Sequence, residues 1–410
     1  MIVTRVEKHI LNQNNEYFSM LDDFCLKAKN LYNHANYIVR QQFVNNGNWI
    51  RYQELDTILK QDTDYPDYRE MPTAQTAQQT LRLLDKNWTS FFKSIRDWSK
   101  HKDKYLGRPK LPKYKSKNGR SLIILTNQEV KLKGGILCFP KSFCRFIIKP
   151  QCIDKDNFDS LQQVRIFPKN KQIEIEIVYN IKVPDIVADT GRYLSIDVGV
   201  DNLATITNNF NDAPVIVNGK GLKSINQYYN KSLAHYKMVN KMMNNQDYSN
   251  RQNRLTVKRN AKINDYLHKA SRFLVNYAKE QTVSIIVIGH NKEWKQNSVL
   301  SKQVNQHFVQ MPFNTLIQQI QYKAEEAGIK VVLVEESYTS GTSFLDNEQP
   351  TKEFYDKSRR KHRGLFKSNK GILINADVNG AFQILKKVFP NAYANGIEGV
   401  AFHPVKVNFG

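Results

Sequence analysis

The sequence has few cysteines, and none of them is arranged as in a structural site. The four cysteines of the 410-residue chain, Cys25, Cys138, Cys144 and Cys152, form no C-x-x-C pair. Structural zinc sites use closely spaced cysteine or histidine pairs, and a disulfide framework needs many cysteines in a short chain. We therefore expect no zinc and no disulfide-stabilised secreted domain.

Long apolar segments and glycine-rich phosphate loops are also missing. No apolar run approaches the roughly 18 residues of a membrane-spanning helix, and Met1–Arg5 do not lead into the apolar core of a signal peptide. Neither a Walker loop nor a dinucleotide-binding fingerprint occurs. We therefore expect a soluble protein of the bacterial cytoplasm with no membrane partner.

Acidic residues are scarce relative to basic ones. The chain has 38 Asp and Glu against 61 Lys and Arg, a net charge of +23. Solubility needs far less, so the excess indicates a polyanionic partner, with nucleic acid favoured over a membrane surface. The length predicts two or three domains.

The region after the first 20 residues has helical periodicity. Apolar residues recur at spacings of three and four over 22–40, and 52–59 resumes the pattern after Asn46-Gly47-Asn48. The strongest helix runs from Ala74 to Trp98, with Pro72 just before its first turn. Its apolar stripe is typical of a helix-bundle core and does not itself indicate a binding surface.

Residues 101–120 form a basic, irregular segment. They hold eight Lys and Arg and one acid, together with Gly107, Pro109 and Pro112. A solvated loop would explain this composition, but in so basic a chain phosphate contact is the better hypothesis. The candidate contacts are Arg108, Lys110, Lys113 and Lys115.

Residues 121–183 read as short strands separated by turn residues. Five runs of this kind predict a small β-barrel, which a first strand within 1–14 would join. The predicted barrel domain covers 1–20 and 116–187, with a helical lobe and the basic linker inserted at 21–115. The segment Lys182–Ile186 reads as a linker to the last domain.

The most informative stretch is Tyr193–Ala204. Residues 193–196 read as a buried strand that ends at Asp197, and Gly199 permits a turn into a second strand over 203–207. A carboxylate there is costly unless it is paired, hydrogen-bonded or bound to a metal. Ribonuclease-H-like nucleases present their first metal ligand in this way, and a buried aspartate that caps a turn is the alternative.

The remaining elements complete a recognisable order. Strands are predicted at 215–217, 283–288 and 329–335, and helices within 220–280, 312–327 and 376–388. The resulting order, βββ-α-β-α-β-α, is the ribonuclease-H topology, and Asp377 opens the last helix, where a carboxylate suits the helix dipole. Between Lys220 and Lys262 there are ten Lys and Arg and one acid, so these helices are expected to contact phosphate, through Lys220, Arg254, Lys258 and Arg259.

Three motifs in this order resemble a known family. Leu194–Ala204, Tyr338-Thr-Ser340 and Ile374–Ala381 look like the RuvC-type nuclease motifs of TnpB, a family encoded by insertion sequences and ancestral to type V CRISPR effectors. The resemblance implies an α+β multidomain fold. A small wedge barrel with an inserted helical recognition lobe would precede a RuvC-like, ribonuclease-H-like nuclease domain over 188–410.

The family also implies an activity and partners. It implies an RNA-guided DNA endonuclease that binds a guide RNA and cuts a double-stranded DNA target beside a short adjacent motif, as a monomer or as a dimer on RNA. The guide would come from a transposon end or from a CRISPR-like array, the latter if the chain is a type V-like effector. The rivals are an RNA-guided DNA-binding repressor without nuclease activity and a plain RNA-binding protein.

The sequence departs from the family in two places. The family usually carries a catalytic glutamate directly after the strand that here ends at Ile288, where this chain has Gly289-His290-Asn291. The family also usually has a four-cysteine zinc ribbon after the Tyr-Thr-Ser motif. Residues 337–371 instead form a cysteine-free basic insertion, with phosphate contacts expected from Arg359, Arg360 and Arg363.

The missing glutamate leaves two hypotheses, an inactive nuclease or a relocated carboxylate. Glu335 and Glu336 end the strand expected beside the one ending at Ile288, so either would reach the same metal ions, unless they are merely solvated. Glu336 is the more distinctive of the two. Glu293 is a third candidate, but Lys292 beside it makes a surface pair more plausible.

Relocation leads to a specific mechanism. All ligands would be hard oxygens, which suit Mg²⁺ or Mn²⁺. Two ions roughly 3.5–4 Å apart would catalyse phosphodiester hydrolysis. Asp197 would bridge both ions, and Glu336 and Asp377 would each hold one, with Glu335 as the alternative to Glu336.

Overall fold

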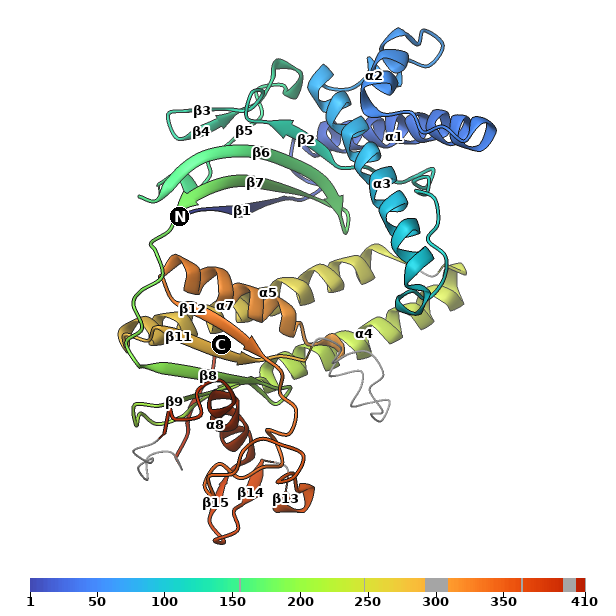
Figure 1. Ribbon diagram of the computed structural model, residues 1–410. Coiled ribbons are helices and arrows are strands. Elements are labelled where there is room, and N and C mark those ends of the chain that lie inside the picture. The colour runs from blue at the N-terminus through green and yellow to red at the C-terminus, as the bar shows by residue number, and fades with distance from the viewer. Residues whose placement is uncertain (155, 247, 292–308, 363, 394–402, 410) are drawn as a thin grey trace. The chain divides into compact units, whose positions relative to one another are not determined.

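The computed structural model describes the whole chain except residues 155, 247, 292–308, 363, 394–402 and 410. It divides into two compact units, Met1–Lys182 and Val183–Gly410 (Figure 1). The division lies within Lys182–Ile186, the segment predicted as a linker. Among the described residues, no helix has the length and apolar character needed to cross a membrane.

The first unit contains the predicted helices, in somewhat longer form. They are α1 (Phe18–Asn46), α2 (Tyr52–Gln61) and α3 (Ala74–Lys100). A capping box in which the Thr73 and Thr76 side chains bond each other's backbone N–H groups starts α3. The predicted apolar stripe of α3 forms core from Ala77 to the fully buried Trp88. Ala74 is exposed, and the later part of the stripe, from Phe91 on, is only partly buried.

Two separate sheets make up the rest of this unit. The larger has the order β1-β7-β6-β2 and the smaller the order β3-β4-β5. The strands are β1 (Ile2–Leu11), β2 (Ile123–Thr126), β3 (Lys131–Lys133), β4 (Ile136–Cys138), β5 (Ile147–Ile148), β6 (Phe158–Lys169) and β7 (Gln172–Lys182). Short 3₁₀ turns lie at Pro66–Tyr68, Lys102–Lys104, Lys141–Phe143 and Cys152–Asp154.

This pairing corrects the prediction of one barrel made of short strands. The runs at 163–167 and 173–178 are parts of one long hairpin, β6–β7, turned at Asn170 and Lys171. Both turn residues have positive φ, 52° and 58°, as in the turns that match the natural twist of a hairpin. Because this long hairpin pairs with β1 and β2 only, the described strands do not close by backbone pairing into a single barrel.

The second unit is built on a six-stranded sheet of order β12-β11-β8-β9-β10-β16. Strands β8, β11 and β12 are mutually parallel, whereas β9 is antiparallel to both β8 and β10. The strands are β8 (Tyr193–Val198), β9 (Asn202–Asn208), β10 (Val215–Asn218), β11 (Ile285–Gly289), β12 (Lys330–Val334) and β16 (Val405–Val407). The predicted neighbourhood of β11 and β12 is therefore confirmed, whereas β16 was not predicted.

Helices cover both faces of this sheet. Figure 1 shows α5 and α7 on one face and α8 on the other. The helices are α4 (Lys220–Asn244), α5 (Asn250–Glu280), α7 (Phe313–Glu326) and α8 (Ala376–Val388). Alternate residues of β8 divide between the faces: Leu194 and Ile196 join the core with α5 and α7, and the Ser195 hydroxyl donates to the Ala381 carbonyl of α8 (2.7 Å). Asp197, two residues after Ser195, therefore faces α8.

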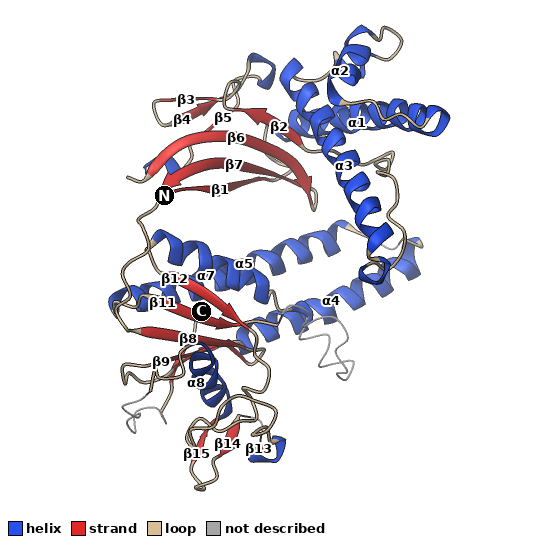
Figure 2. Cartoon of the chain, in the orientation of Figure 1, coloured by secondary structure: helices blue, strands red, loops and turns tan. Residues whose placement is uncertain are grey.

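The basic insertion between β12 and α8 is folded. It contains a 3₁₀ turn (Lys357–Arg359) and a small antiparallel sheet, visible beside α8 in Figure 2. The strands are β13 (Arg360–His362), β14 (Leu365–Lys367) and β15 (Leu373–Asn375). Since β15 runs directly into α8, this sheet connects the insertion to the helix that carries Asp377.

Candidate active site

Asp197 and Gly289 stand side by side at one edge of the sheet. Ile196 of β8 pairs with Ile288 of β11, and both strands run in the same direction. Their next residues, Asp197 and Gly289, therefore lie together at the carboxyl ends of the strands. A carboxylate on β11 would reach Asp197 from position 289, but glycine has no side chain.

The side chain of Glu336 fills the space above Gly289. Gly289 pairs with Val334 of β12, and Glu336 follows two residues later, on the same face as Val334. A Cβ atom added at position 289 would lie 2.6 Å from Glu336 Cγ and 2.7 Å from Ile384 Cδ1. No side chain fits at position 289 while the Glu336 side chain occupies this space. The position of Glu336 therefore depends on glycine at 289.

Hydrogen bonds hold the chain around Glu336. Its backbone N–H donates to Asn291 Oδ1 (3.1 Å), and its carbonyl accepts from the Thr339 N–H (3.1 Å) and hydroxyl (2.8 Å). Thr339 is the middle residue of the Tyr-Thr-Ser motif. One function of that motif in this chain is therefore to fix the turn after β12 that carries Glu336.

Glu335 points elsewhere. Its side chain is exposed and accepts a hydrogen bond from the Ser337 hydroxyl, and its carbonyl accepts from Lys387 Nζ (2.8 Å). Of the two adjacent acids, only Glu336 lies over Gly289. Glu293, the third candidate, lies outside the described residues.

Asp377 enters the site from the first turn of α8. Asn375 caps the helix, its Oδ1 accepting from the N–H groups of Asp377 (3.0 Å) and Val378 (3.2 Å). The Asp377 carboxylate accepts from Asn202 Nδ2 (2.7 Å) and lies 3.3 Å from Arg360 Nη2. Helix α8 approaches Asp197 closely at Gly380, where an added Cβ atom would lie 3.1 Å from Asp197 Oδ2.

Burial and neighbouring charges change the pKa values of two carboxyl groups in this site. Burial raises the pKa of Asp197 well above its usual value, and the negative charges of Glu336 and Asp377 raise it further, while Arg360 opposes the shift. Burial also raises the pKa of Glu336 to about 8, against the opposing effect of Lys387. At neutral pH, without a cation, the cluster therefore retains protons that isolated carboxyl groups would lose.

The donor set fits a hard divalent cation. Glu336 Oε1 is buried and has no hydrogen-bond partner within the described part of the chain, and every candidate ligand is a carboxylate oxygen. Across the described ranges, no three His, Cys, Asp or Glu side chains already stand as a complete metal-binding group. In this arrangement, Arg360 and Asn202 hold the Asp377 carboxylate.

Comparisons with known proteins show what this chain is similar to. The family model OrfB_IS605, described as a probable transposase, matches residues 176–295, and the model of the Cas12f1-like TNB domain matches 313–384. The TnpB-like protein ORF457 of Acidianus two-tailed virus is 25% identical over 395 residues, covering 88% of this chain and 81% of the relative.

The chain is therefore similar to TnpB-family proteins. Two solved structures are similar in outline. A Cas12f1–sgRNA–target DNA complex is 14% identical, with 93% of this chain and 98% of that chain covered and a TM-score of 0.36. The mini-RNA-guided endonuclease CRISPR-Cas_phi3 is 10% identical, with 94% and 92% covered and a TM-score of 0.46.

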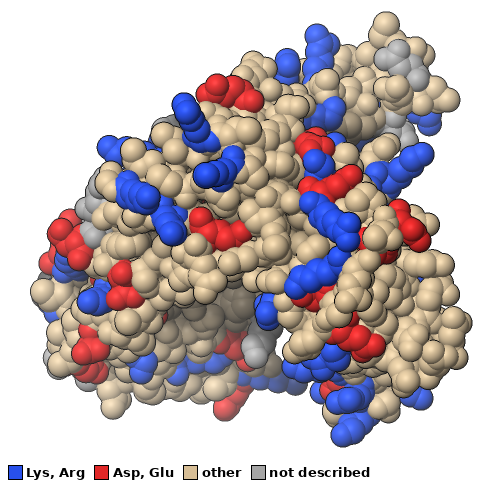
Figure 3. Space-filling view, turned by 90° about the horizontal axis from the view of Figure 1, so that it is seen from above, with Lys and Arg blue, Asp and Glu red and all other residues tan. Residues whose placement is uncertain are grey.

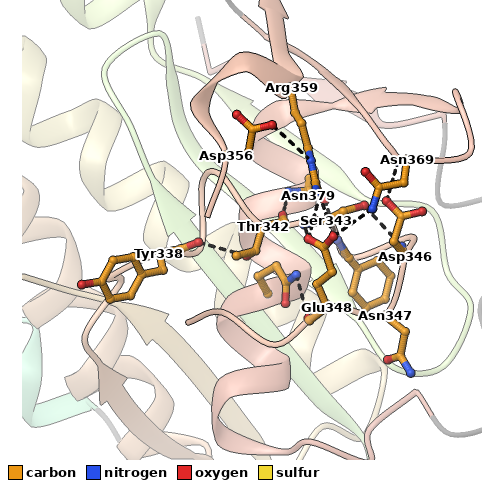
Figure 4. A network of polar contacts seen from close by, with 12 residues as sticks. Tyr338, Thr342, Ser343, Asp346, Asn347, Glu348, Asp356, Arg359, Asn369 and Asn379 are labelled. Atoms are coloured by element: carbon orange, nitrogen blue, oxygen red, sulfur yellow. Dashed lines mark hydrogen bonds and ion pairs between the residues drawn. The ribbon is translucent and has the colours of Figure 1, made fainter. Parts of the chain in front are cut away.

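A buried carboxylate, Glu348, is the centre of the cysteine-free insertion. Glu348 accepts from Arg359 Nη1 (2.7 Å to each oxygen), from the Ser343 N–H (2.7 Å) and from Asn369 Nδ2 (3.1 Å). Figure 4 shows these groups converging on Glu348. Arg359 was predicted to contact phosphate, but its side chain is only 17% exposed and serves this ion pair instead.

Polar residues on one side of α8 bind the same segment. Asn379 bonds the backbone of Thr342 and Phe344, while Gln383 and Lys386 donate to the Glu348 carbonyl. These three side chains are spaced four and three residues apart, so they share one helix face. That face, together with the Glu348–Arg359 pair, holds β13 where its first residue, Arg360, meets Asp377.

The other predicted phosphate contacts divide into exposed and engaged groups. Arg259 bonds Asn226 and the Gln310 carbonyl, and Lys115 is half-buried with its Nζ 4.7 Å from the centre of the Tyr32 ring. Arg363 lies outside the described residues. The contacts that remain exposed are Arg108, Lys110, Lys113, Lys220, Arg254 and Lys258. On the face drawn in Figure 3, basic side chains are scattered among acidic and neutral ones and form no continuous patch.

The Glu348 network yields a stability prediction. Glu348→Gln leaves the mostly buried Arg359 guanidinium with only its longer contact to Asp356 (3.8 Å). This loss should cost about 3 kcal/mol, whereas Glu353→Gln, an exposed change in the same insertion, should cost nothing measurable. Thermal melting at neutral pH compares the two variants. Equal melting temperatures would contradict the assigned role of Glu348. Because no cysteine follows Cys152, we also expect a zinc chelator to leave the wild-type melting temperature unchanged.

Glu336 yields a pH prediction for the metal-free protein. Its folded pKa of about 8 exceeds the usual carboxyl value, so the folded state keeps a proton that the unfolded state loses. Glu336 therefore lowers stability progressively as the pH rises from about 5 to 8. Without divalent ions, Glu336→Gln should melt increasingly above wild type over this range, and Glu335→Gln should not. A difference that is independent of pH would show that Glu336 is not forced to hold a proton.

Proposed function

We propose that this chain is an RNA-guided DNA endonuclease that hydrolyses phosphodiester bonds with a RuvC-like site. The observation that carries the proposal is the Glu336 carboxyl group, which lies over Gly289 at the edge of the sheet where Asp197 and Asp377 also meet. The placement supports the hypothesis that β12 supplies the acid that β11 lacks. The sequence similarity to a TnpB-like protein favours the same activity.

The carboxylates have a chemical reason to be together only if a cation joins them. Asp197, Glu336 and Asp377 would hold Mg²⁺ or Mn²⁺, since their oxygens are hard ligands and one of them, Glu336 Oε1, is buried without a partner. When bound, the metal supplies Lewis-acid stabilisation of the phosphate and a water of lowered pKa. Asp197, between the other two, is the residue best suited to bridge.

Arg360 has two possible partners in this scheme. In the metal-free arrangement its guanidinium lies 3.3 Å from Asp377 and balances part of the negative charge. Once Asp377 is a metal ligand, the guanidinium can donate to a phosphate oxygen, for which its planar geometry is suited. The phosphate contact expected of Arg360 would then occur at the cutting site itself.

Recognition would rest mainly on pairing rather than on protein contacts. Pairing between guide RNA and target strand reads the sequence, while the protein binds backbone and a short duplex motif. The exposed cations, including Lys220, Arg254 and Lys258 of α4 and α5, are available for phosphate contacts. The guide RNA and the double-stranded DNA target are thus the proposed partners, whether the guide comes from a transposon end or a CRISPR-like array.

One observation favours a second candidate. The ion pair between Arg360 and Asp377 neutralises one of the proposed metal ligands, and β11 lacks its own acid. A nuclease-inactive, RNA-guided DNA-binding repressor would tolerate both features. The two candidates share partners and differ in one outcome, which is cleavage.

Asp197→Ala and Asp377→Ala test the proposal. Each should abolish Mg²⁺-dependent cleavage of a plasmid target by the protein with its co-purified RNA, while target binding stays within about threefold, because affinity comes from pairing and phosphate contacts. Asp265→Ala, which removes an exposed carboxylate on α5, should cut at the wild-type rate.

The outcomes separate the candidates. Loss of binding in proportion to cleavage would make the two aspartates structural. A wild-type complex that binds its target tightly but never cuts it would favour the repressor.

A further inference from the structure

The first unit contains a groove that the proposed cleavage chemistry does not use. It has a volume of about 360 Å³ and lies between α3 and the basic segment that follows it. Its walls are aromatic, polar and cationic; they are formed by Tyr32, Asn87, Ser90, Phe91, Ser94, Pro109, Lys110, Pro112 and Lys113.

One wall is a strap of chain, residues 109–117, held in place by α1. The Pro112 carbonyl accepts from Asn36 Nδ2 (3.1 Å) and from Arg40 Nε and Nη2 (3.2 and 2.7 Å). Asn33 bonds both the N–H and the carbonyl of Lys115, and Lys29 donates to the Lys117 carbonyl. The four α1 side chains are spaced by four, three and four residues, so a single helix face fixes the strap.

The opposite wall is the exposed side of α3. Phe91 packs against Trp88 (ring centroids 5.9 Å apart) and is itself half-buried, so one part of its surface is left for the groove. Asn87 Nδ2 donates to the Tyr32 hydroxyl (3.0 Å), leaving the amide oxygen available. Ser90 and Ser94 add hydroxyl groups one turn apart.

Two lysines at the rim give the groove its charge. Lys110 and Lys113 are exposed, and within the described part of the chain neither has an ion-pair or hydrogen-bond partner. They lie at opposite ends of Leu111-Pro112, whose carbonyl at Pro112 is fixed by Arg40 and Asn36. The positive charge is thus presented from a fixed backbone and not from a mobile loop.

We propose that this groove binds one unpaired nucleotide of a nucleic-acid strand. An aromatic ring offers a stacking surface for any base, the amide and hydroxyls match base edges, and the two lysines match the flanking phosphates. A paired base would not enter, because its edges and faces are covered within the duplex. The inference deepens the proposed function and rests on it only for the choice of nucleic acid as the natural ligand.

Direct binding measurements test the groove. Fluorescence anisotropy of the full-length protein, without Mg²⁺, is measured with a labelled oligouridylate, the matching oligodeoxythymidylate and a short DNA duplex. Phe91→Leu, which removes the ring but keeps an apolar side chain, should weaken single-strand binding by about tenfold. Ser94→Trp, which fills the groove, should do the same, and neither should change duplex binding.

The charge contribution has a matched control. Lys110→Gln/Lys113→Gln and Lys131→Gln/Lys133→Gln each remove two exposed lysines from the first unit, the second pair on β3 outside the groove. General electrostatic loss should be equal in both. We expect the groove pair to weaken single-strand binding about tenfold more than the control pair.

The outcomes of these binding measurements either support or overturn the proposal for the groove. Single-strand affinities of both groove-wall variants equal to wild type, or equal losses in the two lysine pairs, would overturn the proposal. A stronger effect on the RNA probe assigns the guide as ligand, and a stronger effect on the DNA probe assigns a DNA strand. Because no cleavage is measured, a wild type that binds but never cuts would contradict the endonuclease proposal and leave this one standing.

Discussion

Three carboxyl groups that repel each other are the constraint around which the second unit is arranged. Asp197 and Glu336 are held at the edge of the sheet with pKa values raised by burial, and the charge of Asp377 adds to the effect on Asp197. Such an arrangement lowers stability unless a cation joins the groups. The fold keeps it nevertheless, through strand pairing, a capped helix and a glycine at each close approach, Gly289 and Gly380. Supporting structure around a cluster that is costly to hold is consistent with the metal-dependent active site that we propose.

The proposed exchange between β11 and β12 would move a metal ligand to the neighbouring strand while keeping its position in the site. Neighbouring parallel strands end at the same edge, so a side chain two residues beyond Val334 can reach the space above Gly289. The change also needs a turn that holds Glu336, which Asn291 and Thr339 provide. The Glu348–Arg359 pair supports the site from the other side by fixing the insertion and, through β13, the position of Arg360.

Much of this could be predicted from the sequence because it depends on local patterns and on topology. The helices of the first unit and the order of strands and helices in the second follow from periodicity and strand order. The expected meeting of Glu336 with Asp197 and Asp377 rested in addition on the family resemblance, which implies an acid where this chain has Gly289. The pairing of Glu348 with Arg359 was missed, because Arg359 was assigned to phosphate contact and Glu348 was given no role. The polar spacing Asn379, Gln383, Lys386 on an otherwise apolar helix was the available signal. The long β6–β7 hairpin was missed for a similar reason: local runs do not show how far strands pair.

The rate of DNA cleavage by Glu336→Gln, beside Glu335→Gln, tests the central claim most directly. Both changes remove one charge and keep the side chain's size, and both are measured in single turnover at saturating guide RNA and Mg²⁺. The account predicts that Glu336→Gln loses several orders of magnitude in rate while still binding its target, because a metal ligand is lost, and that Glu335→Gln stays close to wild type, because its side chain points away from Gly289. A near-wild-type rate in Glu336→Gln would contradict the account, and a collapse confined to Glu335→Gln would move the ligand to the neighbouring residue.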